Sequence, residues 1–534
     1  MFWVVYRGEG GYRLLSSWQG RSKHPWTILF LCLFDALTLW GAILLLNDRN
    51  YLYLFFLLIT AISINYIYLS EKCYPLRYIL PGTFFMFLLV VYPIFYNIYI
   101  SFTNYGTGHI LSKEQVIQKL EERYYIPSKP EEYYFTVFKS PDGSKFILAL
   151  EDDKGQLYLG ENGEIILRSN SPEYFIKRNH EGTINSINGY EKLTKKELFK
   201  YLSILQGIEF IKNQDSVIRM KDTSTYVLCR KQYQYLPQND KIIDNKNNKE
   251  YRPVDGFFTS SEGEKLLPGY KTYIGWQNYF KLITDRSIAT PFLQVFTWTF
   301  QFAFLSVLGT FLIGVLLAIL LNDNKLLFKR LYRTLLILPY AIPGFISILI
   351  WRGLFNEEFG VINNILKALS ISPFSWLTDA TCTKLALVLV NLWLGYPYMM
   401  LIILGSLQSI NKTLYEAAAI DGASGWQKFS HITLPLLLVS VGPLLISSFA
   451  YNFNNYSVIY LFNKGRPPMI GADTPAGKTD ILITYTYRLA FETGQGADFG
   501  LASTVTILIF IITAIITQVN FGFTGALEDV KGND

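Results

Sequence analysis

The chain has 534 residues, of which 50% are hydrophobic and only 17% charged, against about 25% charged in typical globular proteins. This composition excludes an ordinary soluble protein, and a net charge of +6 without a clustered basic face excludes a nucleic-acid-binding protein. The four cysteines (Cys32, Cys73, Cys229 and Cys382) have neither zinc-site nor disulfide-framework spacing.

Eight apolar segments are long enough to cross a bilayer as helices, which takes about 20 residues. We expect spans at 26–46, 51–69, 78–100, 291–321, 333–355, 384–406, 433–456 and 499–520. The first two are separated by only four residues, which predicts a tight helical hairpin. Because a basic arm precedes this apolar pair, we expect a retained first span and no cleaved signal peptide.

Lysines and arginines in the short loops predict the orientation of these spans. The N-terminal arm, loop 70–77 and loop 322–333 (with Lys325) are basic, and all fall on one side if the spans alternate. Four basic residues in loop 462–498 argue the other way. We place the basic loops and both termini in the cytoplasm of a multi-pass protein of the cytoplasmic (inner) membrane.

Residues 106–290 interrupt the spans on the opposite side of the membrane. Ser112 followed by Gln115 predicts a capped helix, and short β-rich runs separated by Asp-Gly, Lys-Gly and Asn-Gly turns predict hairpins. The polar segment 239–253 is predicted to be a linker. We therefore expect N-terminal spans in 1–105, an extracytoplasmic α+β domain with its linker in 106–290, and a helical core in 291–534.

The segment 411–435 between two spans is more ordered than a passive connector needs to be. Asn411 and Ser424 stand where they would cap two short helices, and Gly422 stands where the first helix would end in a left-handed residue. Leu434 and Pro435 lead into the next span. The pattern predicts a docking surface for a partner, or alternatively a well-capped surface loop.

The same segment resembles the cytoplasmic EAA loop of ABC importer permeases. The match covers Glu416-Ala417-Ala418, Gly422, Ile432 and Leu434-Pro435 at the family's spacing. In that family the loop lies in a cleft of the ATP-hydrolysing subunit and passes its closing motion to the spans. The residues that this resemblance implies for ATPase coupling are Glu416, Ala417, Ala418, Asp421, Gly422, Ile432, Leu434 and Pro435.

Further segments narrow the resemblance to the larger permease subunit of maltose/maltodextrin ABC importers. They include "YPIFYNIYISFTNYG", "YRTLLILPYAIPGFISILIWRGLFN", "NLWLGYPYMM", "SSFAYNFNNY" and "DFGLASTVTILIF". The likeness is close over 75–107 and from about 271 onward, and architectural over 106–270. It implies a type I importer permease fold, that is, an all-α polytopic membrane protein of about eight transmembrane helices with an inserted α+β extracytoplasmic domain.

Two segments place polar or helix-breaking residues inside predicted spans. Gly395 and Pro397 predict an interruption of span 384–406, and Asn452, Asn454 and Asn455 lie deep in span 433–456. Ser448, Tyr451, Asn452 and Asn455 recur at helical spacing, which predicts a shared face that suits a sugar through hydroxyl, amide and aromatic groups. Hydrogen bonding between helices is an equal alternative from the residues alone.

The resemblance favours the sugar site. The substrate-binding residues that it implies are Leu394, Gly395, Tyr398, Ser448, Tyr451, Asn452 and Asn455, with Tyr451 in place of a phenylalanine common in the family. Asp35, alone in the first span, is expected to turn toward a neighbouring helix or the interface.

Nothing in the sequence indicates catalysis. Gly477-Lys478-Thr479 lacks the upstream glycine spacing of a phosphate loop, and the four histidines are scattered. The resemblance implies a transport subunit without a cofactor of its own, because ATP and Mg²⁺ would be bound by a dimeric ATPase subunit.

We therefore expect a permease that imports maltose or maltodextrin by alternating access. Its expected partners are that ATPase, a second and smaller permease, an extracytoplasmic sugar-binding protein, the sugar and membrane lipid, but no nucleic acid. Two alternatives remain: an importer of another oligosaccharide, such as a galactoside, and an ion-coupled secondary transporter or membrane-anchored sensor.

Overall fold

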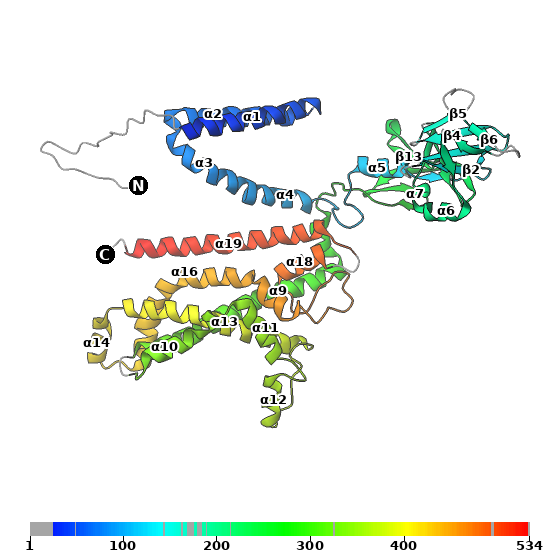
Figure 1. Cartoon of the computed structure of the whole chain (residues 1–534). Helices are drawn as coiled ribbons and strands as arrows, with labels where there is room; N and C mark the ends of the chain where they lie inside the picture. The colour runs from blue at the N-terminus through cyan, green and yellow to red at the C-terminus, as the bar shows by residue number, and fades with distance from the viewer. Residues whose placement is uncertain are drawn as a thin grey trace. The chain divides into compact units, whose positions relative to one another are not determined.

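The computed structural model describes residues 25–531 except 49, 142–144, 162–163, 168–175, 179–183, 188, 214, 324–325 and 493–495. The basic N-terminal arm, Lys325 and the predicted turns at 142–143 and 162–163 lie outside these residues. The described chain forms two compact units, one ending at Tyr96 and the other beginning at Asn97 (Figure 1).

The first unit is a set of apolar helices. α1 (Pro25–Asn47) and α2 (Tyr51–Leu69) form the predicted hairpin, followed by η1 (Glu71–Cys73), α3 (Tyr74–Met86), a π turn η2 (Phe87–Val91) and the first half of α4 (Tyr92–Ser101), which continues into the second unit. Asp35 on α1 accepts a hydrogen bond from Asn65 Nδ2 on α2 (2.7 Å), which confirms that this acid turns toward a neighbouring helix. No side chain of α2 is buried, as expected for a helix that faces lipid.

The inserted sheet domain follows α4. Helix α5 (Lys113–Glu121) has the predicted capping box between Ser112 and Gln115. An eleven-stranded sheet comprises β1 (Tyr124–Tyr125), β2 (Glu132–Lys139), β3 (Phe146–Asp152), β4 (Leu157–Glu161), β5 (Glu164–Leu167), β6 (Ile176–Arg178), β7 (Ile184–Ile187), β8 (Tyr190–Lys192), β9 (Phe210–Asn213), β10 (Ser216–Met220) and β11 (Thr225–Lys231). Its main strand order is β5-β4-β3-β2-β11-β10-β9. The short helices α6 (Lys195–Lys200) and α7 (Leu202–Gln206) precede β9.

A second sheet corrects the prediction of a linker at 239–253. It is an antiparallel meander of β12 (Tyr233–Leu236), β13 (Lys241–Asp244), β14 (Lys249–Val254), β15 (Phe257–Ser260) and β16 (Lys265–Leu266). Asp244 accepts a hydrogen bond from the Lys246 amide, and Asn248 takes a positive φ of 53°, so the polar run is a hairpin turn. Ile242 and Tyr251 on either side are buried, an alternation that the many lysines and asparagines concealed.

The helical core contains the elements from α8 to α19. They are α8 (Gln277–Thr284), α9 (Arg286–Asn322), α10 (Lys329–Ile337), η5 (Leu338–Ala341), α11 (Gly344–Leu354), α12 (Val361–Ala368), α13 (Ala380–Ser409), α14 (Lys412–Ile420), α15 (Gly425–Lys428), η6 (Phe429–Thr433), α16 (Leu434–Phe453), α17 (Tyr456–Asn463), α18 (Leu482–Phe491) and α19 (Phe499–Lys531).

The long helices α9, α13, α16 and α19 lie side by side (Figure 1). A Cβ on Gly314 of α9 would stand 3.1 Å from the Met399 and Met400 backbone of α13, and one on Gly395 would stand 2.9 Å from Thr310 of α9. These two glycines let α9 and α13 approach closely. Gly395 therefore has a packing role besides the substrate contact that the resemblance implies for it.

Seven helices in the described residues are long and apolar enough to span a membrane, or eight if one bent pair is counted as a span. That pair falls on the span predicted at 333–355, and its two segments, on either side of residues 342–343, meet at 92°. Pro343 forces Ile342 into an extended conformation (φ −102°, ψ 127°). By contrast, α13 runs unbroken through Gly395 and Pro397, where an interruption was predicted.

Candidate functional site

The segment 411–435 forms one end of the helical core, which we call the loop end. Asn411 caps α14 through the Thr413 amide, and Ser424 caps α15 through the Gln427 amide, as predicted. Gly422 is left-handed (φ +78°) and closes a Schellman motif, in which the amides of Ala423 and Gly422 donate to the carbonyls of Ala418 and Ala419 (2.9 and 3.2 Å). The loop therefore consists of two short helices, each capped at its start, joined by a hydrogen-bonded turn.

The residues implied for ATPase coupling lie mostly on the surface of this end. The exposed members are Glu416, Ala417, Asp421, Gly422 and Pro435, and the half-buried members are Ala418, Ile432 and Leu434. Leu434 packs against the apolar cluster between α9, α13 and α16. An exposed helix joined to a segment that packs against the core suits a surface that binds a partner and remains attached to the rest of the protein.

The middle of the core contains a buried amide cluster that links three helices. Asn391 Nδ2 of α13 donates to Asn452 Oδ1 of α16 (2.7 Å), and Asn455 Nδ2 donates to Asn391 Oδ1 (3.1 Å). Asn452 Nδ2 also donates to the Ser448 carbonyl (2.8 Å), and Asn455 Oδ1 caps α17 at Val458. All three asparagines are buried, so their amides satisfy one another in this conformation.

Tyr451 and Tyr398 have a different environment from these amides. Tyr451 is 70% exposed and Tyr398 42% exposed, and both lie near Tyr340 of η5. Helix α16 ends at Phe453, so Asn455 lies beyond the helical face on which the spacing placed it. The residues predicted to share one polar face therefore have two environments. The tyrosines are exposed, whereas Asn452 and Asn455 are buried and hydrogen-bonded. Leu394, Gly395 and Ser448 are half-buried.

Asn391 and Tyr340 lie beside the residues implied for sugar binding, and the sequence analysis did not single them out. Asn391 lies seven residues before Tyr398, which is two helical turns on the same face of α13, so helical spacing would have found it. Tyr340 lies in the bend between Leu338 and Gly344. The span predicted at 333–355 gave no indication that this residue lies near α13 and α16.

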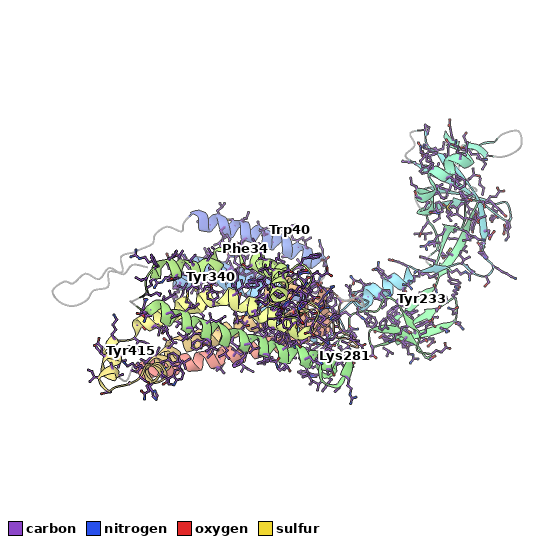
Figure 2. The ribbon with its side chains drawn as sticks, turned by 90° about the horizontal axis from the view of Figure 1, so that it is seen from below. Phe34, Trp40, Tyr233, Lys281, Tyr340 and Tyr415 are labelled. Atoms are coloured by element: carbon purple, nitrogen blue, oxygen red, sulfur yellow. The ribbon has the colours of Figure 1, made fainter. Side chains whose placement is uncertain are left out.

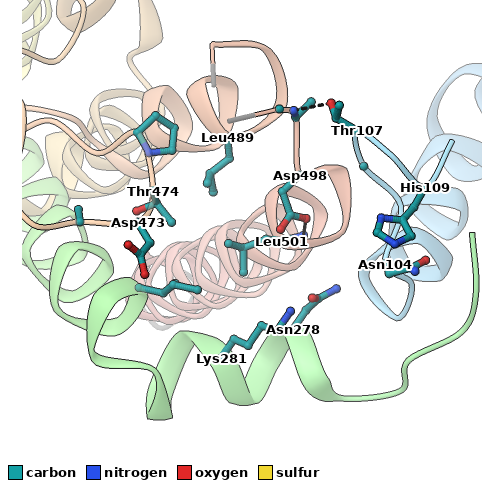
Figure 3. Close-up of a pocket in the computed structure, with 16 residues that line it drawn as sticks. Asn104, Thr107, His109, Asn278, Lys281, Asp473, Thr474, Leu489, Asp498 and Leu501 are labelled. Atoms are coloured by element: carbon teal, nitrogen blue, oxygen red, sulfur yellow. Dashed lines mark hydrogen bonds between the residues drawn. The ribbon is translucent and has the colours of Figure 1, made fainter. Parts of the chain in front are cut away.

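A pocket of about 500 Å³ lies at the opposite end of the core, which we call the domain end because residues 102–111 leave it for the sheets (Figure 3). Lys281 of α8, Asp473 and Asp498 line it, and Asp498 Oδ1 caps α19 through the Leu501 amide (2.8 Å). His109 stacks edge-on against Phe257, and burial lowers the pKa of its imidazole while Asp498 opposes this. Figure 2 shows Lys281 and Tyr415 at the two ends of the core.

The loop between α17 and α18 is held by a buried ion pair. Asp480 is fully buried, and its Oδ2 accepts hydrogen bonds from Arg488 Nη1 (2.8 Å) and the Gly477 amide (2.6 Å). Burial raises the pKa of Asp480 to about 6, although Arg488 lowers it. The Gly-Lys-Thr segment is thus an anchored turn. Among the described residues, no three His, Cys, Asp or Glu side chains are grouped as metal ligands.

Comparisons with known proteins identify families and relatives that this chain resembles. Residues 84–163 match the N-terminal family of TM subunits in PBP-dependent ABC transporters, and residues 286–524 match the binding-protein-dependent transport system inner membrane component family. The maltose/maltodextrin transport system permease proteins MalF of Klebsiella aerogenes and Escherichia coli K12 are each 37% identical over 95% of this chain and 98% of their own length. A solved bacterial ABC transporter involved in alginate import shares 22% identity over 48% of this chain and 84% of its own, with a TM-score of 0.41.

Proposed function

The chain belongs to the family of maltose/maltodextrin transport system permease proteins, and from this premise we propose that it is the larger membrane subunit of an ATP-driven, binding-protein-dependent importer of maltose or maltodextrins. The observation that carries the proposal is 37% identity over 95% of the chain. Such a subunit moves its substrate without hydrolysing ATP, which is the work of a separate ATPase dimer. A second, smaller permease completes the pathway.

The loop end faces the cytoplasm in this proposal, as do both termini. The exposed face of α14, with Glu416 and Asp421, sits in the ATPase, and the turn at Gly422 holds α14 at a fixed angle to α15. The sheet domain and the domain end then lie outside, where a sugar-binding protein docks.

The tyrosines and asparagines in the middle of the core bind the sugar. Tyr398, Tyr451 and Tyr340 offer aromatic faces to the C–H surface of a sugar ring, and Ser448, Asn452 and Asn455 offer polar partners to its hydroxyls. The hydrogen bonds among Asn391, Asn452 and Asn455 support a pocket without sugar. When the sugar enters, its hydroxyls replace the neighbouring amides as hydrogen-bond partners of Asn452 and Asn455.

The test is co-purification in mild detergent followed by an ATPase assay. The tagged chain, expressed in its native host, is isolated and reconstituted, and ATP hydrolysis is measured with and without maltose-loaded binding protein. We expect an ATPase and a second permease to co-purify and the loaded binding protein to raise hydrolysis.

Each other outcome assigns a different function. Co-purification without stimulation by maltose, but with stimulation by galactoside-loaded protein, would make another oligosaccharide the substrate. A chain that carries sugar without any ATPase would contradict the proposal and indicate an ion-coupled transporter.

A further inference from the structure

Helix α14 touches the rest of the core at very few points. Of its nine residues, Tyr415 and Ala418 are half-buried and the other seven are exposed. Along the backbone, α14 is joined to α15 through the turn at 421–424, whose Gly422 is left-handed and has open space around it. Such a turn sets the angle between α14 and α15, but it transmits a movement of α14 poorly, because local opening of an exposed turn costs little free energy.

A second connection bypasses the turn. Tyr415 Oη and Thr433 Oγ1 are 2.9 Å apart, and Thr433 is buried (7% exposed). Thr433 Oγ1 donates to the Lys428 carbonyl (3.4 Å), which leaves its lone pairs to accept the hydrogen bond from the Tyr415 hydroxyl. The bond thus joins an exposed helix to a buried side chain eighteen positions further along.

Thr433 stands at the foot of the span that carries the proposed sugar site. It is the last residue of the π turn η6, and α16 begins at the next residue. The twenty residues of α16 extend about 30 Å, up to Tyr451 and Asn452. A displacement of Thr433 therefore moves a continuous helix whose far end contacts Asn391.

We propose that Tyr415 is a positioning residue for transport, whose hydroxyl passes the movement of α14 to α16 through Thr433. This inference rests on the proposed function, because it takes α14 as the surface that the ATPase moves. Without the bond, α14 follows the ATPase by flexing at Gly422, and α16 lags behind. ATP is then hydrolysed with less sugar carried per ATP.

The experiment uses Tyr415→Phe and Thr433→Val, each of which removes the bond and keeps nearly the same volume. The full importer, reconstituted in proteoliposomes with its ATPase, second permease and loaded binding protein, is assayed for ATP hydrolysis and sugar uptake together. We expect hydrolysis near wild type and uptake per ATP reduced roughly two- to tenfold, the range that follows from one net hydrogen bond. The double variant is expected to match the single variants, because both remove the same bond.

Two matched controls remove the same groups elsewhere at the loop end. Tyr332→Phe alters an exposed tyrosine of α10, and Thr334→Val alters an exposed threonine of the same helix, whose hydroxyl donates to the Arg330 carbonyl (3.0 Å). Both are expected to keep the wild-type ratio of sugar to ATP.

The outcomes separate this inference from the proposed function. If wild type fails to couple ATP to uptake, the proposed function fails. If wild type couples and Tyr415→Phe keeps the same ratio, the positioning role is wrong. If Tyr415→Phe instead loses the ATPase on purification, the bond only holds the loop together, which also overturns the inference.

Discussion

Asn391 connects the two polar segments that the sequence singled out. It is buried at 5% exposure, and it both donates to Asn452 and accepts from Asn455. In a low-dielectric interior such a mutually satisfied group is stable only while all its members are present, because each buried amide left alone loses its hydration without replacement. Asn391 thereby determines whether the side-chain amides of Asn452 and Asn455 are hydrogen-bonded to another helix.

Replacing Asn391 by leucine, which has a similar shape, is predicted to destabilise the core. The change leaves Asn452 Oδ1 and Asn455 Nδ2 buried without that partner, at about 1–3 kcal/mol each. Thermal unfolding of the purified chain in detergent should show a lower midpoint.

The control is Asn454→Leu, in which the lost amide bonds only the Ala450 carbonyl of its own helix (3.3 Å). It should shift the midpoint less. Equal shifts for the two variants would mean that the interhelical amide bonds add nothing to stability.

The element that the sequence predicted best is the segment 411–435. Both caps and the left-handed glycine were expected from local spacing, since capping depends on residues three or four positions apart. The π turn η6 and the bond from Tyr415 to Thr433 were not predicted, because each depends on how α14 folds back against the foot of α16.

Gly422→Ala is predicted to loosen the end of α14. No atom lies within 4 Å of the position that a Cβ would take, so the cost is only that of a left-handed conformation, about 1–2 kcal/mol. Hydrogen exchange at the amides of residues 422 and 423 should accelerate roughly 5- to 30-fold.

Gly425→Ala is the matched control, because its added Cβ also meets open space and its φ is not positive. It should leave exchange unchanged at these amides. Unaltered exchange in Gly422→Ala as well would mean that the Schellman motif does not limit the opening of this turn.

At the scale of the whole molecule, distant segments meet at the domain end. Asn278 of α8 is 2% exposed, and its Nδ2 donates to the carbonyls of Ser101 and Thr103 (3.0 and 2.9 Å). A Cβ on Gly500 of α19 would come within 2.8 Å of the same Nδ2. The end of α4, the helix α8 and the start of α19 therefore close around one amide, beside the pocket of Lys281 and Asp498.

Asn278→Ala is predicted to open this junction. The Thr103 carbonyl loses the Asn278 donor, at about 1–3 kcal/mol, and the Ser101 carbonyl keeps only the longer bond from Thr504 Oγ1 (3.4 Å), so limited proteolysis should cut within residues 101–109 faster than in wild type. Gln277→Ala, one position away and exposed, should leave the cleavage rate unchanged. The prediction is wrong if both variants are cut alike.

The sequence by itself determined the features that depend on near neighbours along the chain: the apolar spans, the capping box at Ser112, the helix cap at Ser424, and the motif from Glu416 to Pro435. Hydropathy and capping act over a few residues, so a pattern is enough to predict them. Tertiary structure decided the rest. The meander at 239–253 depends on partner strands, the 92° bend placed Tyr340 beside Tyr398 and Tyr451, and Asn391 met Asn452 and Asn455 across 61 and 64 positions. The physical reason is that a buried amide or aromatic ring is stabilised by whichever groups surround it, and these come from segments that only the folded chain brings together.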